Sequence, residues 1–297
     1  MNSTKTPVLT PVFVAWCIAV FAGVNLQAHM GWDVLARWGY LPESAIYEGK
    51  YWGLISMAFV HQEPLHLIFN LYWLWILGNA FERRLGTPAF LGFVLTTAFI
   101  SSGIQMGSGE IGIGFSGVGY ALFGFAWMTR TRYPDFARII NDKTVQMFVG
   151  WFFLCIVSTY IGFMKIANVA HLAGFLSGAA IGAMIAQPAK RPLLYIGLFF
   201  LAMASVIPLF WNPLSFDWVA HQAYQAMVKH DYPVATRYLQ RGIEMDGDPS
   251  WCWSNLAQIY AFEGKPAEYR YALEQVRKAD PEAADGIEKR YGKSQQK

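Results

Sequence analysis

The sequence has little charge. Only 14% of its 297 residues are charged, whereas about 25% is usual in soluble domains. At 55%, the hydrophobic share is too high for a disordered chain. Cysteine is scarce as well: Cys17, Cys155 and Cys252 lie far apart, which excludes a disulfide scaffold and a cysteine-based metal site. The net charge of +3 is too small to indicate a nucleic-acid-binding protein.

The low charge content comes from seven runs of at least 18 residues that contain no Asp, Glu, Lys or Arg. About 18 to 20 apolar residues in a helix cross the hydrocarbon core of a bilayer. We therefore expect an all-α, polytopic membrane bundle over residues 1–213. Its seven spans are predicted near 8–28, 64–81, 88–107, 115–129, 144–164, 168–187 and 192–212.

The basic residues between the spans predict the orientation in the membrane. Nine of them, starting with Lys5, fall on one side of the predicted bundle and three on the other. The positive-inside rule then places the N-terminus in the cytoplasm, most simply at a cell (inner) membrane. Spans 64–81, 115–129 and 168–187 run from outside to inside. An odd number of spans puts the C-terminal region on the non-cytoplasmic side.

Residues 217–297 have the ordinary charge density of a soluble domain and repeat at an offset of 34 residues. Ala223 aligns with Ala257, and Leu239 with Leu273. This period resembles the tetratricopeptide repeat, a helix–turn–helix unit. Two repeats are fewer than the roughly three that form a stable stack. We therefore expect the tail to need further stabilising contacts, such as those with a protein partner. A helical hairpin of another kind is the alternative.

Four polar residues stand out inside the apolar runs, because a polar group in hydrocarbon is costly unless it is partnered. They are His66, Asn70, Ser116 and His171. At about 1.5 Å of rise per residue, all four lie roughly 18–24 Å from the cytoplasmic ends of their helices. They therefore share one layer in the outer half of the bilayer. This shared depth favours a common site.

Helical spacing also places these residues on shared faces. Ser116 and Tyr120 are four residues apart, and His171 precedes Gly174 and Gly178 at spacings of three and four. Small residues at such spacing let helices approach closely in lipid. Close approach would bring the Ser116 hydroxyl to the His171 imidazole, as a serine nucleophile and its base require. The spans contain no carboxylate to orient the histidine, so we expect a dyad, with Tyr120 packing against the ring.

An acyl-transfer site also needs hydrogen-bond donors for the oxyanion. His66 and Asn70, on one face at the same depth, are the candidates, together with the backbone N–H of Ser116. Taken singly, each polar residue is more simply a packed, hydrogen-bonded side chain. The joint agreement of depth and face favours the site.

The motifs around these residues resemble those of the rhomboids, a family of intramembrane serine proteases. Span four reads Gly114-Phe115-Ser116-Gly117-Val118-Gly119-Tyr120 and continues to Gly124, which matches GxSGxxYxxxG. Span six matches AHxxGxxxG from Ala170 to Gly178, and span two holds His61-x4-His66-x3-Asn70 before Glu82-Arg83-Arg84-Leu85-Gly86. The motifs occur in the family's order over roughly residues 50–187.

The resemblance implies Ser116 as nucleophile, His171 as general base and then acid, and His66 and Asn70 as oxyanion partners. It implies no metal and no cofactor. The substrates would be membrane proteins with a transmembrane segment, cut near its outer end within the lipid bilayer. Span 144–164, with Trp151, Phe152 and Phe153, would be the mobile gate.

The chain departs from the family pattern in its first loop. The first loop usually carries Trp-Arg, whereas here Trp52 precedes Gly53, so the anchoring of this loop is open. The family core has six spans, which makes span 192–212 and the repeat tail extensions.

A non-catalytic rhomboid-like binder or scaffold that works through its tail is the alternative function. A transporter ranks last, because the polar layer does not form a path through the membrane.

Overall fold

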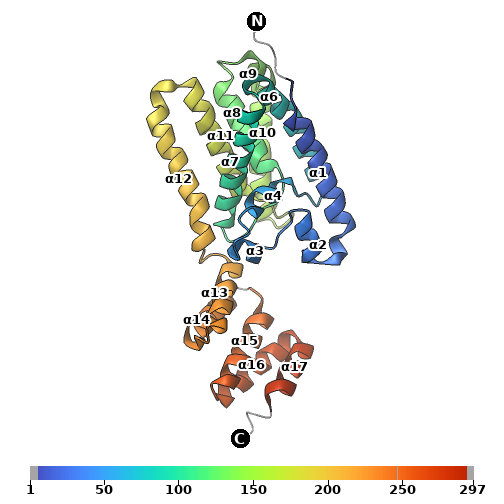
Figure 1. The fold of residues 1–297 in the computed structure, drawn as a ribbon, viewed down its shortest axis with the longest axis vertical. Coiled ribbons are helices and arrows are strands. Elements are labelled where there is room, and N and C mark those ends of the chain that lie inside the picture. The colour runs from blue at the N-terminus through green and yellow to red at the C-terminus, as the bar shows by residue number, and fades with distance from the viewer. Residues whose placement is uncertain (1–5, 246, 293–297) are drawn as a thin grey trace. The chain divides into compact units, whose positions relative to one another are not determined.

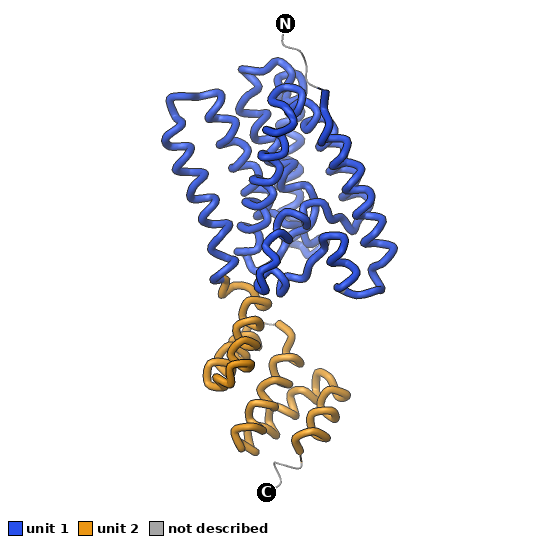
Figure 2. The backbone as a smooth tube through the Cα atoms, viewed as in Figure 1, with its two compact units in different colours: residues 1–211 blue, residues 212–297 orange. Residues whose placement is uncertain are grey.

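The computed structural model describes residues 6–245 and 247–292, and the regular structure of this part of the chain is entirely helical. Residues 1–5, including Lys5, residue 246 and residues 293–297 lie outside the described residues. The chain divides into two compact units, residues 1–211 and 212–297 (Figure 2). The boundary falls where the apolar runs end in the sequence.

Every apolar run of the first unit is helical. The helical elements within these runs are α1 (Leu9–Leu26), α5 (Pro64–Trp73), η3 (Leu74–Gly78), α6 (Asn79–Leu85), α7 (Thr87–Met106), α8 (Ser116–Thr129), α10 (Asp142–Tyr160), α11 (Asn168–Ala186) and α12 (Arg191–Phe210) (Figure 1). α5 and α6 are joined by η3, a π-helical turn. Such turns occur mostly inside α-helices and often near functional sites.

Short helices fill the connections. The long first loop contains η1 (Ala28–Met30), α2 (Trp32–Arg37), α3 (Glu43–Tyr47), α4 (Gly53–Ser56) and η2 (Met57–Phe59), while α9 (Pro134–Ile139) and η4 (Pro188–Lys190) lie in later connections. Leu41, Ile46, Leu54 and Met57 of the first loop are buried in an apolar cluster that also includes Met106 of α7 and Leu209 of α12. This loop is therefore a folded element.

Four of the described helices are long and apolar enough to cross a membrane: Leu9–Leu26, Thr87–Met106, Asn168–Ala186 and Pro188–Phe210. The chain is accordingly an integral membrane protein. Among the other predicted spans, α8 has only 14 residues, fewer than a helix needs to cross about 30 Å. Most of its residues are buried among the other helices, so α8 need not meet the lipid along its full length.

The backbones of α8 and α11 touch along a glycine seam on α11. A Cβ atom on Gly174 would collide with the carbonyl group of Gly117, and one on Gly178 with that of Ala121. At Gly182 the added atom would lie 2.8 Å from the Phe125 carbonyl oxygen. The predicted close approach of spans four and six is therefore present, and only glycine allows it at these positions.

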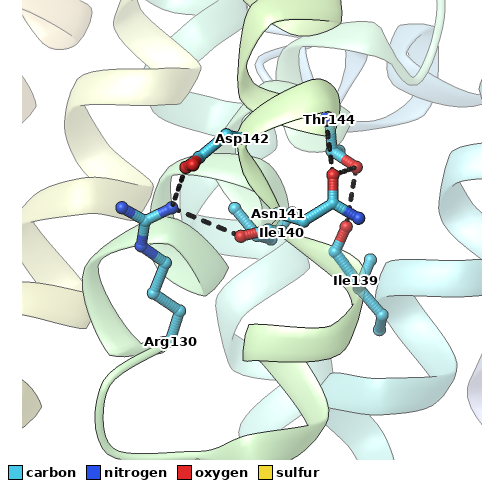
Figure 3. A network of polar contacts seen from close by, with 6 residues as sticks. All are labelled: Arg130, Ile139, Ile140, Asn141, Asp142 and Thr144. Atoms are coloured by element: carbon cyan, nitrogen blue, oxygen red, sulfur yellow. Dashed lines mark hydrogen bonds and ion pairs between the residues drawn. The ribbon is translucent and has the colours of Figure 1, made fainter.

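The start of α10 is tied down by a small polar network (Figure 3). Asn141 caps the helix, since its Oδ1 accepts the N–H of Thr144 at 3.1 Å. Arg130, just after α8, donates to the Ile140 carbonyl at 3.3 Å and lies 3.7 Å from the Asp142 carboxylate. These contacts fix the base of α10 to the end of α8.

The carboxylate of Glu82, in α6, caps the first turn of α1. Its Oε1 accepts the N–H groups of Val8 and Leu9, each at 2.8 Å. Its Oε2 accepts the N–H of Thr10 at 2.9 Å and the hydroxyl of the same residue at 2.8 Å. The Thr87 hydroxyl also donates to Oε1 at 2.8 Å. One buried side chain thus satisfies backbone donors that a helix start otherwise leaves unpaired.

The second unit consists of α13 (Phe216–Val228), α14 (Tyr232–Glu244), α15 (Pro249–Phe262), α16 (Pro266–Ala279) and α17 (Pro281–Tyr291). Four of these helices begin with a side-chain cap, from Ser215, Asp231, Asp248 and Asp280. Short turns join consecutive helices, which pack around a buried apolar cluster. This unit therefore has its own core, as its sequence composition indicates.

We predict that Glu82→Gln lowers the free energy of unfolding by about 1–3 kcal/mol, because a neutral amide has one acceptor oxygen for the five donors that the carboxylate now accepts. The measurement is the midpoint of thermal or SDS-induced unfolding in detergent micelles. Glu110→Gln is the control, since the Glu110–Lys165 ion pair is exposed and should contribute less than about 1 kcal/mol. Equal stability of the two variants would contradict the capping role.

Candidate active site

Ser116 is the first residue of α8, and the segment before it is held in an unusual conformation. Gly114 has φ of +103°, a region that residues with a Cβ rarely adopt. A Cβ at this position would also collide with the imidazole of His66. Glycine is therefore required at position 114 for two reasons: the positive φ angle and the His66 ring beside it. The result places Ser116 at the N-terminal end of α8, where the helix dipole is positive.

The side chains of Ser116 and His171 are in hydrogen-bonding contact. Ser116 Oγ lies 2.8 Å from His171 Nε2, and the imidazole is only 4% exposed. For Nε2 to accept the serine proton, the ring must carry its own proton on Nδ1. Nδ1 is buried and has no hydrogen-bond partner among the residues that the structure describes. The described site is thus a two-residue pair with no carboxylate behind the histidine.

The ring of Tyr120 holds the imidazole in place. The two rings stack with centroids 4.7 Å apart and an interplanar angle of 24°. The Tyr120 hydroxyl donates to the carbonyl of Phe148, in α10, at 3.3 Å. Tyr120 therefore connects the histidine to α10, in addition to packing on it as predicted. Gly117, the other predicted supporting residue in α8, lies at the contact with Gly174.

His66 and Asn70 share one face of α5, but their polar groups are partly engaged. The Asn70 amide nitrogen donates to the His66 carbonyl at 3.0 Å and lies 3.2 Å from His61 Nε2. The His66 ring packs against Gly114 and lies edge-on to the His61 ring, with centroids 5.0 Å apart. His66 therefore borders the segment that leads into Ser116, and Asn70 is connected to that segment through His61.

The sequence reasoning assigned no role to His61, which the structure shows to be the central acceptor beside the site. This residue is fully buried. Its Nδ1 lies 3.2 Å from the Phe59 carbonyl, and its Nε2 accepts the N–H of Phe115 at 3.2 Å. A neutral ring protonated on Nδ1 satisfies both contacts. Its position in the motif, five residues before His66, was the available signal.

Gln105, in α7, is a second residue that the prediction missed. Its Oε1 accepts the N–H of Ala170 at 3.0 Å, directly before His171. This contact caps the first turn of α11 from a neighbouring helix. A glutamine within an apolar run is itself a signal, because it must find a partner there.

Of the three aromatic residues predicted to form a gate, Trp151 stacks on an aromatic ring of α5. Its ring stacks on Phe69 with centroids 4.8 Å apart and an interplanar angle of 22°. Phe152 faces inward and lies edge-on to Tyr120 at 6.0 Å, whereas Phe153 is 60% exposed. One turn further along α5, the Trp73 ring packs on that of Phe148, with centroids 4.6 Å apart. An aromatic seam thus joins α5 to α10.

Comparison with known proteins agrees with this geometry. Residues 48–188 match the family model described as "Rhomboid domain". This segment is similar to rhomboid domains. It carries Ser116, His171, His66 and Asn70, the first loop's α4, and the helices α5 to α11.

Three curated relatives are all named "Rhomboid protease GlpG". The protein of Serratia proteamaculans is 34% identical over 178 residues, covering 59% of this chain and 62% of the relative. That of Yersinia pseudotuberculosis is 32% identical over 181 residues, with coverages of 60% and 62%. That of Klebsiella pneumoniae is 36% identical over 171 residues, with coverages of 56% and 58%. The chain thus spans less than two thirds of the length of these relatives.

We predict that Tyr120→Ala slows the reaction of Ser116 with a fluorophosphonate by about 10- to 100-fold, because the unpacked imidazole no longer stays aligned with Oγ. Tyr120→Phe keeps the stacked ring and loses only the bond to Phe148, so its labelling rate should fall by less than about fivefold. The measurement is the second-order labelling rate in detergent. Equal rates for the two variants would contradict a role for the stacked ring.

Proposed function

We propose that this protein is an intramembrane serine endopeptidase of the rhomboid type, which hydrolyses transmembrane segments of membrane proteins near their outer end. The contact of 2.8 Å between Ser116 Oγ and His171 Nε2 carries the proposal. The similarity of residues 48–188 to rhomboid domains and the similarity to GlpG proteases support it.

In the proposed reaction, Ser116 Oγ attacks the scissile carbonyl carbon while His171 Nε2 takes the hydroxyl proton. The tetrahedral oxyanion is stabilised by the N–H of Ser116 at the start of α8, by the Asn70 amide and by His66. His171 then gives the proton to the leaving amine, which releases one half of the substrate. A water molecule, deprotonated by the same nitrogen, attacks the ester carbonyl and frees Ser116. These steps use side chains and one backbone N–H of this chain, together with a water molecule.

Asn70 would have to redirect its amide during this reaction. In the structure, the amide nitrogen contacts the His66 carbonyl and His61 Nε2. Catalytic hydrogen bonds are often long or differently directed before the substrate binds. A modest rotation of the Asn70 side chain would exchange one of these contacts for the oxyanion.

Substrate is proposed to enter laterally between α5 and α10. The seam there consists of stacked aromatic rings, Phe69 on Trp151 and Trp73 on Phe148. The base of α10 is anchored to the end of α8 by Asn141 and Arg130. An anchored base with a stacked upper half would let α10 tilt outward without leaving the bundle.

For the remaining regions we propose a six-span core with α12 as a seventh span, the N-terminus in the cytoplasm and the tail on the non-cytoplasmic side. The positive-inside distribution of basic residues supports this orientation. The tail is proposed as a tetratricopeptide-like module that binds a protein partner. Its paired helices support this assignment, as do the exposed side chains of Tyr224 and Val228, which lie one turn apart on α13.

Ser116→Ala and His171→Ala are each predicted to lower cleavage of a single-span reporter by at least about 10³-fold, because neither residue of the pair acts without the other. The assay compares purified variants in proteoliposomes, with Ser177→Ala as a matched control, since that hydroxyl donates to the Gly174 carbonyl of its own helix. A reporter cut equally well by wild type and Ser116→Ala would refute the proposal. Absence of fluorophosphonate labelling in the wild type would favour the non-catalytic binder.

Trp151→Ala is predicted to raise kcat/KM for the reporter by about two- to tenfold, because an aromatic pair contributes about 0.5–1.5 kcal/mol to keeping the seam closed. Phe153→Ala, on the exposed face of the same helix, should leave kcat/KM unchanged. The labelling rate of Ser116 by a small fluorophosphonate should change less than kcat/KM, since a small reagent needs less opening. Lower activity of Trp151→Ala would contradict the gating role.

A further inference from the structure

α12 lies outside the segment that matches the Rhomboid domain, yet it packs closely along α7. The contact runs over two glycines four residues apart, Gly103 in α7 and Gly107 directly after its last residue. A Cβ on Gly103 would lie 2.5 Å from the carbonyl oxygen of Ser205, and one on Gly107 would lie 2.9 Å from Pro208 Cγ. Ser205 is fully buried in this seam, with its hydroxyl bonded to the Ala202 carbonyl. Small residues that admit a helix backbone so closely form a specific packing surface.

The last turn of α12 also reaches the first loop. Leu209 is buried in the same apolar cluster as Leu41, Ile46, Leu54 and Met57 of that loop. The Phe210 ring contacts the ring of Tyr51, with centroids 6.1 Å apart. α12 therefore supplies part of the core on which the first loop is folded.

This core explains how the loop is held despite its departure from the family pattern. Trp52 is half exposed, so it does not pin the loop from inside. At the next position, an added Cβ would lie 2.8 Å from Leu41 Cδ1 and would also meet the Ile46 side chain. Gly53 thus lets the loop close over its own core, and the side chain of Leu209 completes that core.

Two routes connect α12 to the catalytic pair. Through the loop, the Met57 carbonyl accepts the N–H of Gly114 at 3.0 Å, two residues before Ser116. Through α7, Gln105 lies between the two glycines of the seam and accepts the N–H of Ala170, next to His171. A shift of α12 would therefore act on the segments that carry both members of the pair.

We propose that α12 is a positioning element for catalysis, whose last turn holds the first loop and α7 in the arrangement that aligns Ser116 with His171. This proposal rests on the proposed protease function. It gives the helix a role beyond attaching the tail to the membrane bundle. Leu209 is the positioning residue on the loop side, and Ser205 marks the seam on the α7 side.

The key variant is Leu209→Ala, which opens a cavity in the loop core. We expect it to lower kcat for the reporter by about three- to tenfold with little change in KM, because a small misplacement of reacting groups slows the chemical step. Leu209→Met, which conserves the volume, should restore kcat. Phe200→Ala is the matched control: it lies on the same helix but its side chain is 65% exposed. Assays are run well below the unfolding midpoint of every variant.

Amide hydrogen exchange of the peptide that contains Gly114 and Phe115 provides a readout independent of activity. Leu209→Ala should speed exchange of these two amides several-fold, since the Gly114 N–H is held by the Met57 carbonyl, and Phe200→Ala should not. Gly103→Leu, which forces α7 and α12 apart, should speed exchange at Ala170 as well.

Unchanged exchange and unchanged kcat in Leu209→Ala would overturn the proposal, as would equal effects in Phe200→Ala. If the wild type neither cleaves the reporter nor labels at Ser116, the protease function fails. The exchange results then decide the positioning role of α12 by themselves.

Discussion

Backbone contact between α8 and α11 is the constraint on which the site depends. Gly174 and Gly178 bring α11 against the carbonyl groups of Gly117 and Ala121, closer than any side chain would permit. At this separation the first turn of each helix presents one polar side chain to the other, and Ser116 meets His171 at 2.8 Å. In lipid, where helices gain little from hydrophobic burial, such close packing supplies much of the association energy.

Around this contact, three buried polar side chains accept N–H groups from other elements. His61 receives the N–H of Phe115, Gln105 receives that of Ala170, and Glu82 receives three N–H groups at the start of α1. Unpaired polar groups in a low-dielectric interior are expensive, so these bonds resist rearrangement. The surroundings of the catalytic pair are therefore rigid on the α7, α8 and α11 side.

The other side of the site is held by aromatic rings. α10 meets α5 through Phe69, Trp151 and Trp73, and stacked rings have no directional hydrogen bonds to break when they separate. A rigid face opposite a more easily separated one suits the proposed protease function, in which a substrate helix would enter from the lipid. Tyr120 touches both, since its ring stacks on His171 and its hydroxyl bonds to α10.

The sequence determined much of this in advance, because membrane helices obey simple rules of length and polarity. The charge-free runs predicted the long helices of the first unit, and the shared depth of Ser116, His171, His66 and Asn70 predicted one site. The sequence did not predict the π-helical turn after Trp73 or the short length of α8. Both features depend on how neighbouring helices cover these segments.

Only the tertiary structure decided the roles of His61, Gln105 and Leu209. Each of these residues acts through a contact with a segment distant in sequence, and no local pattern specifies such a partner. His61 bonds to Phe115 across 54 positions, and Gln105 to Ala170 across 65. The sequence could indicate that a buried polar group needs a partner, but the packing of the bundle determines which one it finds.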